Sequence, residues 1–169
     1  MKSLFWFAER LRLGQDRFYA NTQAMCTSFK VEILTALHAL GTTVTRAGTG
    51  ADVIKAALYL ATATVNAATT AYSSTNEVSG SGYSAGGVTV TNATAPTSSG
   101  TTAYWTPSAS IVYSSVTLST AFDAVLLYNS SQSNKAISVH TFGSQTVTAG
   151  TFTLTMPTND ASNALLRIA

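Results

Sequence analysis

The sequence predicts a mainly β fold, an antiparallel β-sandwich or jelly roll with one short N-terminal helix. Short apolar stretches rich in Val, Thr and aromatic residues follow one another from Val53 to the C-terminus. Gly, Ser, Asn and Pro separate these stretches, and no helical periodicity lies between them. Because parallel strands need long and usually helical connections, this pattern excludes a parallel α/β sheet.

The one helix is expected before the strands. From Ser28 to Leu40 the apolar residues recur at intervals of three and four positions, which places them on one side of a helix. Ser28 suits the N-cap position, and Gly41 suits the position just beyond the C-terminal end. The Thr- and Gly-rich residues 42–50 then predict a loop.

The strands are expected in the remaining two thirds of the chain. The candidates are Val53–Leu60, Gly87–Thr91, Ala103–Trp105, Ser110–Leu118, Phe122–Tyr128, Ala136–Phe142, Thr146–Met156 with a break near Gly150, and Ala164–Ile168. Phe152 and Leu154 alternate with Thr residues, which predicts a strand with one face in water. Residues 125–127 are continuously apolar and predict a central strand buried on both faces. Residues 80–87 and 97–102 are expected to form turns.

Composition favours one domain with few charged residues and many hydroxyl groups. The chain has 169 residues, of which 9% are charged and 46% hydrophobic, and this length suffices for one hydrophobic core. Such a surface suits subunits that pack closely, because little like-charge repulsion accumulates. The lone Cys26 excludes an internal disulfide, and no spacing of Cys and His suits zinc. We expect no cofactor and no metal.

We expect residues 1–24 to form a separate N-terminal arm or extension, and residues 25–169 to form a single β-sandwich domain. The net charge of +2 arises within the arm, and charges in the rest of the chain balance without clustering, so no nucleic-acid interface is expected. The arm is amphipathic, too short in its apolar part for an export signal or membrane span. It either packs on its own domain or docks on a neighbour, and a third alternative is that translation begins at Met25. Its candidate partner-binding residues are Leu4, Phe5, Trp6, Phe7, Arg10, Leu11 and Arg12.

One motif resembles a hydrolase site. Residues 82–86 read Gly-Tyr-Ser-Ala-Gly, and Asp123 and His140 follow Ser84 in the order of a serine, acid and histidine triad. The motif works where a strand turns into a helix, whereas a strand pattern follows here. We therefore expect a glycine turn and no enzyme, with a small hydrolase using Ser84 as the rival.

Three aromatic residues leave a second alternative open. Tyr104, Trp105 and Tyr113 are able to form a platform for stacking sugars, but aromatic residues in a small β domain more often pack in the core. His38 and His140 lie far from any companion ligand in the sequence and are expected to be packed or surface residues.

Several segments resemble a family of small structural proteins encoded among the virion genes of tailed bacteriophages. The segments that carry the resemblance are Ser28–Glu32, Asp52–Tyr59, the glycine-rich Glu77–Gly87, Phe122–Tyr128, Phe142–Gly143 and Leu165–Ile168. Together they span the chain from about Met25 to its end, and the glycine-rich stretch is the most specific.

Phage proteins of this size and class are similar to capsid decoration, or cement, proteins. The resemblance implies a jelly-roll subunit on the outer surface of the virion head that bridges major capsid subunits and stabilises the shell. The implied partners are the major capsid protein and further copies of this chain, with neither nucleic acid nor membrane. The alternative is a tail, head-fibre or receptor-binding module of the virion.

Overall fold

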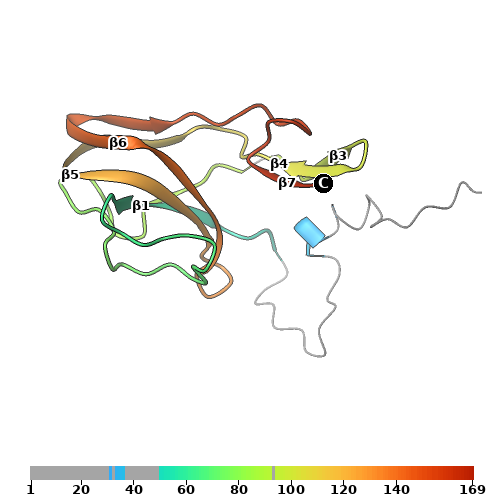
Figure 1. Cartoon of the computed structure of the whole chain (residues 1–169), viewed down its shortest axis with the longest axis horizontal. Coiled ribbons are helices and arrows are strands. Elements are labelled where there is room, and N and C mark those ends of the chain that lie inside the picture. The colour runs from blue at the N-terminus through green and yellow to red at the C-terminus, as the bar shows by residue number, and fades with distance from the viewer. Residues whose placement is uncertain (1–30, 32, 37–49, 93) are drawn as a thin grey trace, which may run out of the picture.

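The computed structural model describes residues 31, 33–36, 50–92 and 94–169, and this part of the chain is mainly β. Its strands are β1 (Ile54–Leu60), β2 (Val88–Thr89), β3 (Thr97–Ser99), β4 (Thr102–Trp105), β5 (Ile111–Asn129), β6 (Lys135–Leu154) and β7 (Leu166–Ile168). They form a four-stranded sheet in the order β2-β1-β5-β6 and a three-stranded sheet in the order β3-β4-β7. All of these pairings are antiparallel, as the sequence predicted. Figure 1 shows the smaller sheet at one end of the larger one.

The middle of the large sheet is buried on both faces. Val125, Leu126 and Leu127 of β5 are each at most 3% exposed, which confirms the prediction of a central strand. Val125 and Leu127 belong to the main core, whereas Leu126 faces the opposite side with Tyr59. Residues between β1 and β2 cover this second side.

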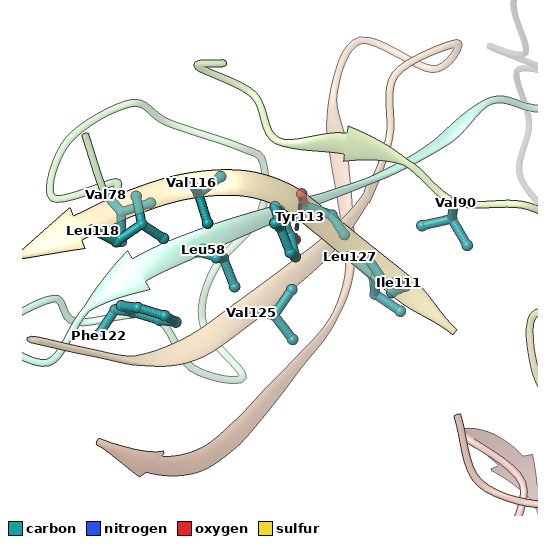
Figure 2. Packing of buried hydrophobic residues seen from close by; sticks show 11 residues of the cluster. Leu58, Val78, Val90, Ile111, Tyr113, Val116, Leu118, Phe122, Val125 and Leu127 are labelled. Atoms are coloured by element: carbon teal, nitrogen blue, oxygen red, sulfur yellow. Dashed lines mark hydrogen bonds between the residues drawn. The ribbon is translucent and has the colours of Figure 1, made fainter. Parts of the chain in front are cut away.

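The long strand β5 bends, so that both of its halves contribute to one core. The sequence predicted two strands, Ser110–Leu118 and Phe122–Tyr128, but the structure has one strand with irregular pairing near the expected break. These irregularities change which side chains point inward, and Figure 2 shows Val116, Leu118 and Val125 converging on Leu58. The strands predicted at Ala136–Phe142 and Thr146–Met156 are likewise one strand, β6. Alternation in its last part is confirmed, because Phe152 and Leu154 pack on the core while Thr153 is exposed.

The small sheet contains the strand that the sequence analysis missed. Residues 97–102 were expected to be a turn, but Thr97–Ser99 forms β3 and pairs with β4. Gly100, with a φ of 58°, supplies the turn between them. The prediction was wrong because a Ser/Thr strand without apolar residues has the same composition as a loop.

The expected N-terminal elements lie mostly outside the described residues. In the helix expected from Ser28 to Leu40, the structure describes one turn, in which Thr35 N donates to the carbonyl of Val31 at 3.0 Å. The arm, residues 1–24, is not described, so the boundary at Met25 stays a prediction.

Candidate functional site

The residues between β1 and β2 close the outer edge of β1. Glu77 is the centre of this closure, since its carboxylate accepts hydrogen bonds from Tyr72 Oη at 2.6 Å, Tyr83 Oη at 2.7 Å and the Gly86 backbone N–H at 2.8 Å. Tyr83 Oη in turn accepts the backbone N–H of Leu58 at 3.0 Å. At this point of the sheet, a tyrosine hydroxyl therefore accepts the backbone hydrogen bond that a carbonyl of a neighbouring strand would otherwise accept.

Backbone groups close the rest of the same edge. Val78 N donates to the carbonyl of Leu58 at 3.0 Å, and Leu60 N donates to the carbonyl of Asn76 at 3.0 Å. At the start of the strand, Val90 N donates to the carbonyl of Ile54 at 2.9 Å. Because unpaired edge groups invite pairing with another chain, this closure protects β1.

Two glycines allow the loop to lie directly on the sheet. A Cβ on Gly87 would lie 1.7 Å from the carbonyl oxygen of Ala56, and a Cβ on Gly80 would lie 2.0 Å from that of Thr117. Gly87 also has a φ of +69°, which residues with side chains rarely adopt. The glycine-rich stretch is therefore a requirement of close packing.

The tyrosines around Glu77 are held in their neutral form. Burial raises the pKa of Tyr83 and of Tyr72 far above the ordinary value, and the hydrogen bond from each hydroxyl to Glu77 raises it further. Burial also raises the pKa of Tyr113, whose hydroxyl donates to the carbonyl of Ala56 at 2.9 Å. These hydroxyls therefore act as permanent donors at neutral pH.

This cluster was not predicted from the sequence. The charged residues after residue 24 do not cluster along the chain, and no second acid lies close to Glu77 in the sequence. The available signal was a single acid flanked by Tyr72 and Tyr83 in a stretch otherwise made of small residues. In such a setting one carboxylate is the natural acceptor for both hydroxyls.

The opposite edge of the sheet, along β6, is open over most of its length. At its start, Ala136 N donates to the carbonyl of Thr70 at 3.1 Å, and Ala71 forms an isolated bridge with Lys135. Beyond this point no strand of the described chain pairs with the outer edge of β6.

The register shows which backbone groups point outward. Val125 pairs with His140, and Leu126 pairs with Val139. Since Leu58 uses its N–H and carbonyl on the outer edge of β1, its partner Val125 directs its own groups toward β6. By the same alternation, Val139 and Thr141 direct their backbone groups away from β5.

The open edge carries no charge. From Ala136 to Leu154, β6 has no Lys, Arg, Asp or Glu, and no Pro. Natural edge strands usually carry such residues to discourage association. The strand is regular in pairing from Ser138 to Thr141, so no bulge protects this part of the edge either.

A groove lies beside this edge, on the face of the sheet opposite the main core. Its volume is about 440 Å³, and its polar lining residues are uncharged Asn, Thr and Ser. The apolar lining residues are Val65, Ala67, Leu126, Ala136, Ile137 and Val139. Ile137 is 37% exposed, which makes it one of the larger exposed hydrophobic side chains of the described chain.

The structure places the serine motif in a loop that leads into a strand. Gly87 N donates to the carbonyl of Ser84 at 2.9 Å, and β2 follows, as the sequence analysis expected. His140 is hydrogen-bonded through Nε2 to Ser138 Oγ at 2.9 Å, and burial lowers the pKa of its imidazole. No described hydrogen bond joins Ser84, Asp123 or His140 to one another.

The aromatic residues considered as a sugar platform are largely buried. Trp105 is 6% exposed, and its indole N–H is directed at Asn92 Oδ1 at 3.1 Å and the carbonyl of Thr94 at 3.0 Å. Tyr113 is 2% exposed. The interpretation as core packing is therefore confirmed for these two residues.

The partner-binding residues expected in the arm, Leu4, Phe5, Trp6, Phe7, Arg10, Leu11 and Arg12, lie outside the described residues. Among the residues that are described, no three His, Cys, Asp or Glu gather in a way that would hold a metal ion. In that same part of the chain, no helix has the length and apolar character needed to cross a membrane. Comparison with protein-family models, with curated proteins and with solved structures gave no match.

Proposed function

We propose that this chain is a structural protein of a tailed-bacteriophage virion that binds the outer surface of the head and stabilises the shell by bridging major capsid subunits. The observation that carries the proposal is the contrast between the two edges of the large sheet. One edge is closed by the chain itself, and the other presents unpaired backbone groups without charge. A subunit whose task is to bind other protein subunits has a use for such an edge.

The low content of charged residues and the packing of β5 support the same proposal. Only 9% of the residues are charged, so many copies are able to lie close together without strong repulsion. Multivalent attachment of many copies adds stability to a shell even if each contact is modest. We include in the proposal a sandwich or jelly-roll arrangement, because both halves of β5 pack on one core.

The arm supplies a second candidate contact. Leu4, Phe7 and Leu11 recur at helical spacing, and Arg10 and Arg12 add basic groups. Aromatic and Arg residues are common anchors of protein interfaces. A chain without residues 1–24 is expected to bind heads more weakly, and unchanged binding would remove the arm from the proposal.

The proposal assigns no catalytic step to the protein. The competing hypothesis is a hydrolase that uses Ser84, and a fluorophosphonate probe distinguishes the two. Labelling that disappears in Ser84→Ala would support the hydrolase, whereas absence of labelling in the unaltered protein is the result we expect.

The test of location uses purified virions separated into heads and tails. Mass spectrometry measures where the protein partitions and its ratio to the major capsid protein. We expect it in heads at a copy number comparable to that of the capsid protein. Partition with tails, or a handful of copies per particle, would overturn the proposal in favour of a tail, head-fibre or receptor-binding module.

A further inference from the structure

The groove beside β6 is an apolar surface that no described residue covers. Its volume is about 440 Å³, and Leu126, Val139 and Ile137 contribute to its lining. The polar residues around them are uncharged, so the groove offers neither an ion pair nor a site for a charged ligand. Its chemistry fits apolar side chains of a protein chain.

The N-terminal part of the chain is attached close to this groove. Val53 N donates to Ser131 Oγ at 2.9 Å, and Asn129 Nδ2 donates to Asp52 Oδ2 at 2.7 Å. Asn129 is the last residue of β5, and Ser131 lies in the turn that leads from β5 into β6. The chain that precedes Gly50 is therefore attached to the β domain near the first residues of β6, where the groove lies.

The distances are short relative to the length of this preceding chain. From Lys135 to Val139 the strand advances by roughly 13 Å, at about 3.3 Å per residue. The 39 residue steps from Leu11 to Gly50 have a contour length on the order of 100 Å even with a helix at residues 28–40, at about 1.5 Å per helical residue and about 3.3 Å per extended residue. The arm thus reaches the groove of its own copy without being stretched.

We propose that the apolar side of the arm, Leu4, Phe7 and Leu11, occupies the groove beside β6 of the same copy. The arm holds the densest group of large apolar residues outside the described β domain, Leu-Phe-Trp-Phe at positions 4–7. Attachment at the adjacent turn raises the effective concentration of the arm at the groove to the order of millimolar. Intramolecular occupancy is therefore favoured over binding of a second copy at ordinary protein concentrations.

The inference also deepens the proposed function, on which this one step rests. With its apolar side chains in the groove, the arm leaves the outward backbone groups of Val139 and Thr141 unpaired. Leu4, Phe7 and Leu11 are then used within the copy, and Arg10 and Arg12 are the part of the arm that remains for a partner, beside the open edge of β6. The experiment below uses the isolated protein, so its outcome does not depend on the location of the protein in a virion.

Disulfide trapping tests the inference on the full-length chain. Cys26→Ser removes the native thiol, and Phe7→Cys is combined with Ile137→Cys at the exposed rim of the groove. The matched control combines Phe7→Cys with Thr153→Cys, which is exposed on the distant half of the same strand. We expect the Ile137 pair to form an intramolecular disulfide at least about tenfold faster than the Thr153 pair, because the groove holds the arm nearby.

Two outcomes would overturn the inference. Equal rates for the two pairs would show that the arm has no preference for the groove. Disulfides that form only between copies, detected by mixing isotopically labelled and unlabelled protein, would show that a second copy occupies it.

Tryptophan fluorescence gives a second readout without added cysteines. The chain has two Trp residues, and Trp105 is 6% exposed. Trp6→Phe combined with Phe7→Trp moves the other reporter to the apolar side of the arm, so acrylamide quenching that changes on alteration of the groove reports position 7. Ile137→Arg places a charge on the exposed rim, and Thr153→Arg is its control. We expect quenching at position 7 to increase several-fold only in Ile137→Arg, and an unchanged quenching profile would contradict the inference.

Discussion

The two edges of the large sheet differ in how their backbone groups are satisfied. Along β1, the residues between Asn76 and Val90 supply backbone partners and one tyrosine hydroxyl. Along β6, Val139 and Thr141 direct their groups outward, and no described strand pairs with them. The glycine-rich stretch and the tyrosines around Glu77 close the β1 edge, and no described segment closes the β6 edge of the same sheet in this way.

This difference indicates where the subunit meets other proteins. The backbone groups of β1 are covered only because Gly87 lies directly against the strand and Glu77 holds the loop by hydrogen bonds. Few other residues could replace either one. The regular part of the β6 edge, Ser138–Thr141, is uncharged and has none of the usual protection against association. We therefore place the candidate contact at β6, and the closed edge serves as an internal reference for testing it.

Raising the pH is expected to lower the free energy of unfolding more than any substitution below, because it acts on five tyrosines at once. Folding raises the pKa of five tyrosines, Tyr59, Tyr72, Tyr83, Tyr113 and Tyr128. Their contribution to stability is fully present below the unfolded pKa of about 10 and is lost as pH rises above it. Circular dichroism and absorbance at the phenolate band should show unfolding and tyrosine ionisation together in strong alkali. Ionisation of these five tyrosines in a still folded protein would contradict this account.

Gly87→Ala is expected to be the most damaging single substitution on the closed edge. Its methyl group would lie 1.7 Å from the carbonyl oxygen of Ala56, at a φ of +69°. We expect a loss of about 3 kcal/mol in the free energy of unfolding, measured by chemical denaturation. Gly100→Ala is the control, because its φ of +58° is similar but nothing lies within 4 Å. It should cost about 1 kcal/mol, and equal losses would show that contact with the sheet is unimportant.

Glu77→Ala tests the centre of the tyrosine cluster. The substitution leaves the hydroxyls of Tyr72 and Tyr83 and the N–H of Gly86 without their acceptor. We expect a loss of about 2–3 kcal/mol in the free energy of unfolding. Asp160→Ala is the matched control, since this carboxylate accepts from Asn163 in an exposed turn. A similar loss in both variants would refute the central role of Glu77.

Tyr83→Phe removes the hydroxyl that accepts the backbone N–H of Leu58 on the closed edge. Leu58 N–H loses its acceptor and Glu77 loses one donor. We expect a loss of about 1–2 kcal/mol and faster amide hydrogen exchange at Leu58. Tyr104→Phe, on the small sheet, serves as the control and should change neither quantity. Unaltered exchange at Leu58 in Tyr83→Phe would mean that the hydroxyl does not close this edge.

Thr141→Lys is expected to have the smallest effect on stability and a distinct effect on assembly. Thr141 is exposed on β6, so the free energy of unfolding should change by no more than about 0.5 kcal/mol. A Lys at an open edge discourages strand pairing, so binding to heads that lack the protein should fall. Thr153→Lys, also exposed on β6, is the control. Equal head binding by both variants would exclude the Ser138–Thr141 edge as the contact.

Alternation and turn residues predicted much of this fold from the sequence. The burial of residues 125–127 followed from their continuous apolar character, and the wet face of β6 followed from its Thr residues. Strand β3 was missed because its residues, Thr97–Ser99, are all polar. The bend in β5 was taken as a break, because a bulge and a chain break both interrupt alternation.

The candidate site was harder to predict than the fold. Glu77 contacts Tyr72 and Tyr83, which lie five and six residues away in the sequence, and neither strand alternation nor helical periodicity predicts such contacts within a loop. The open edge of β6 depends on strand order, which alternation within a single strand does not encode. The serine motif illustrates the reverse case, because local sequence resembled a site that lies instead in a loop before β2.

Amide hydrogen exchange measured on the free protein and on protein bound to heads tests the contrast between the edges most directly. We expect Leu58 to be protected in both states, and Val139 and Thr141 to exchange rapidly in the free protein and to become protected on the head. Val139 and Thr141 amides that are already protected in the free protein, or that stay unprotected on the head, would contradict the assignment of the open edge as the contact surface.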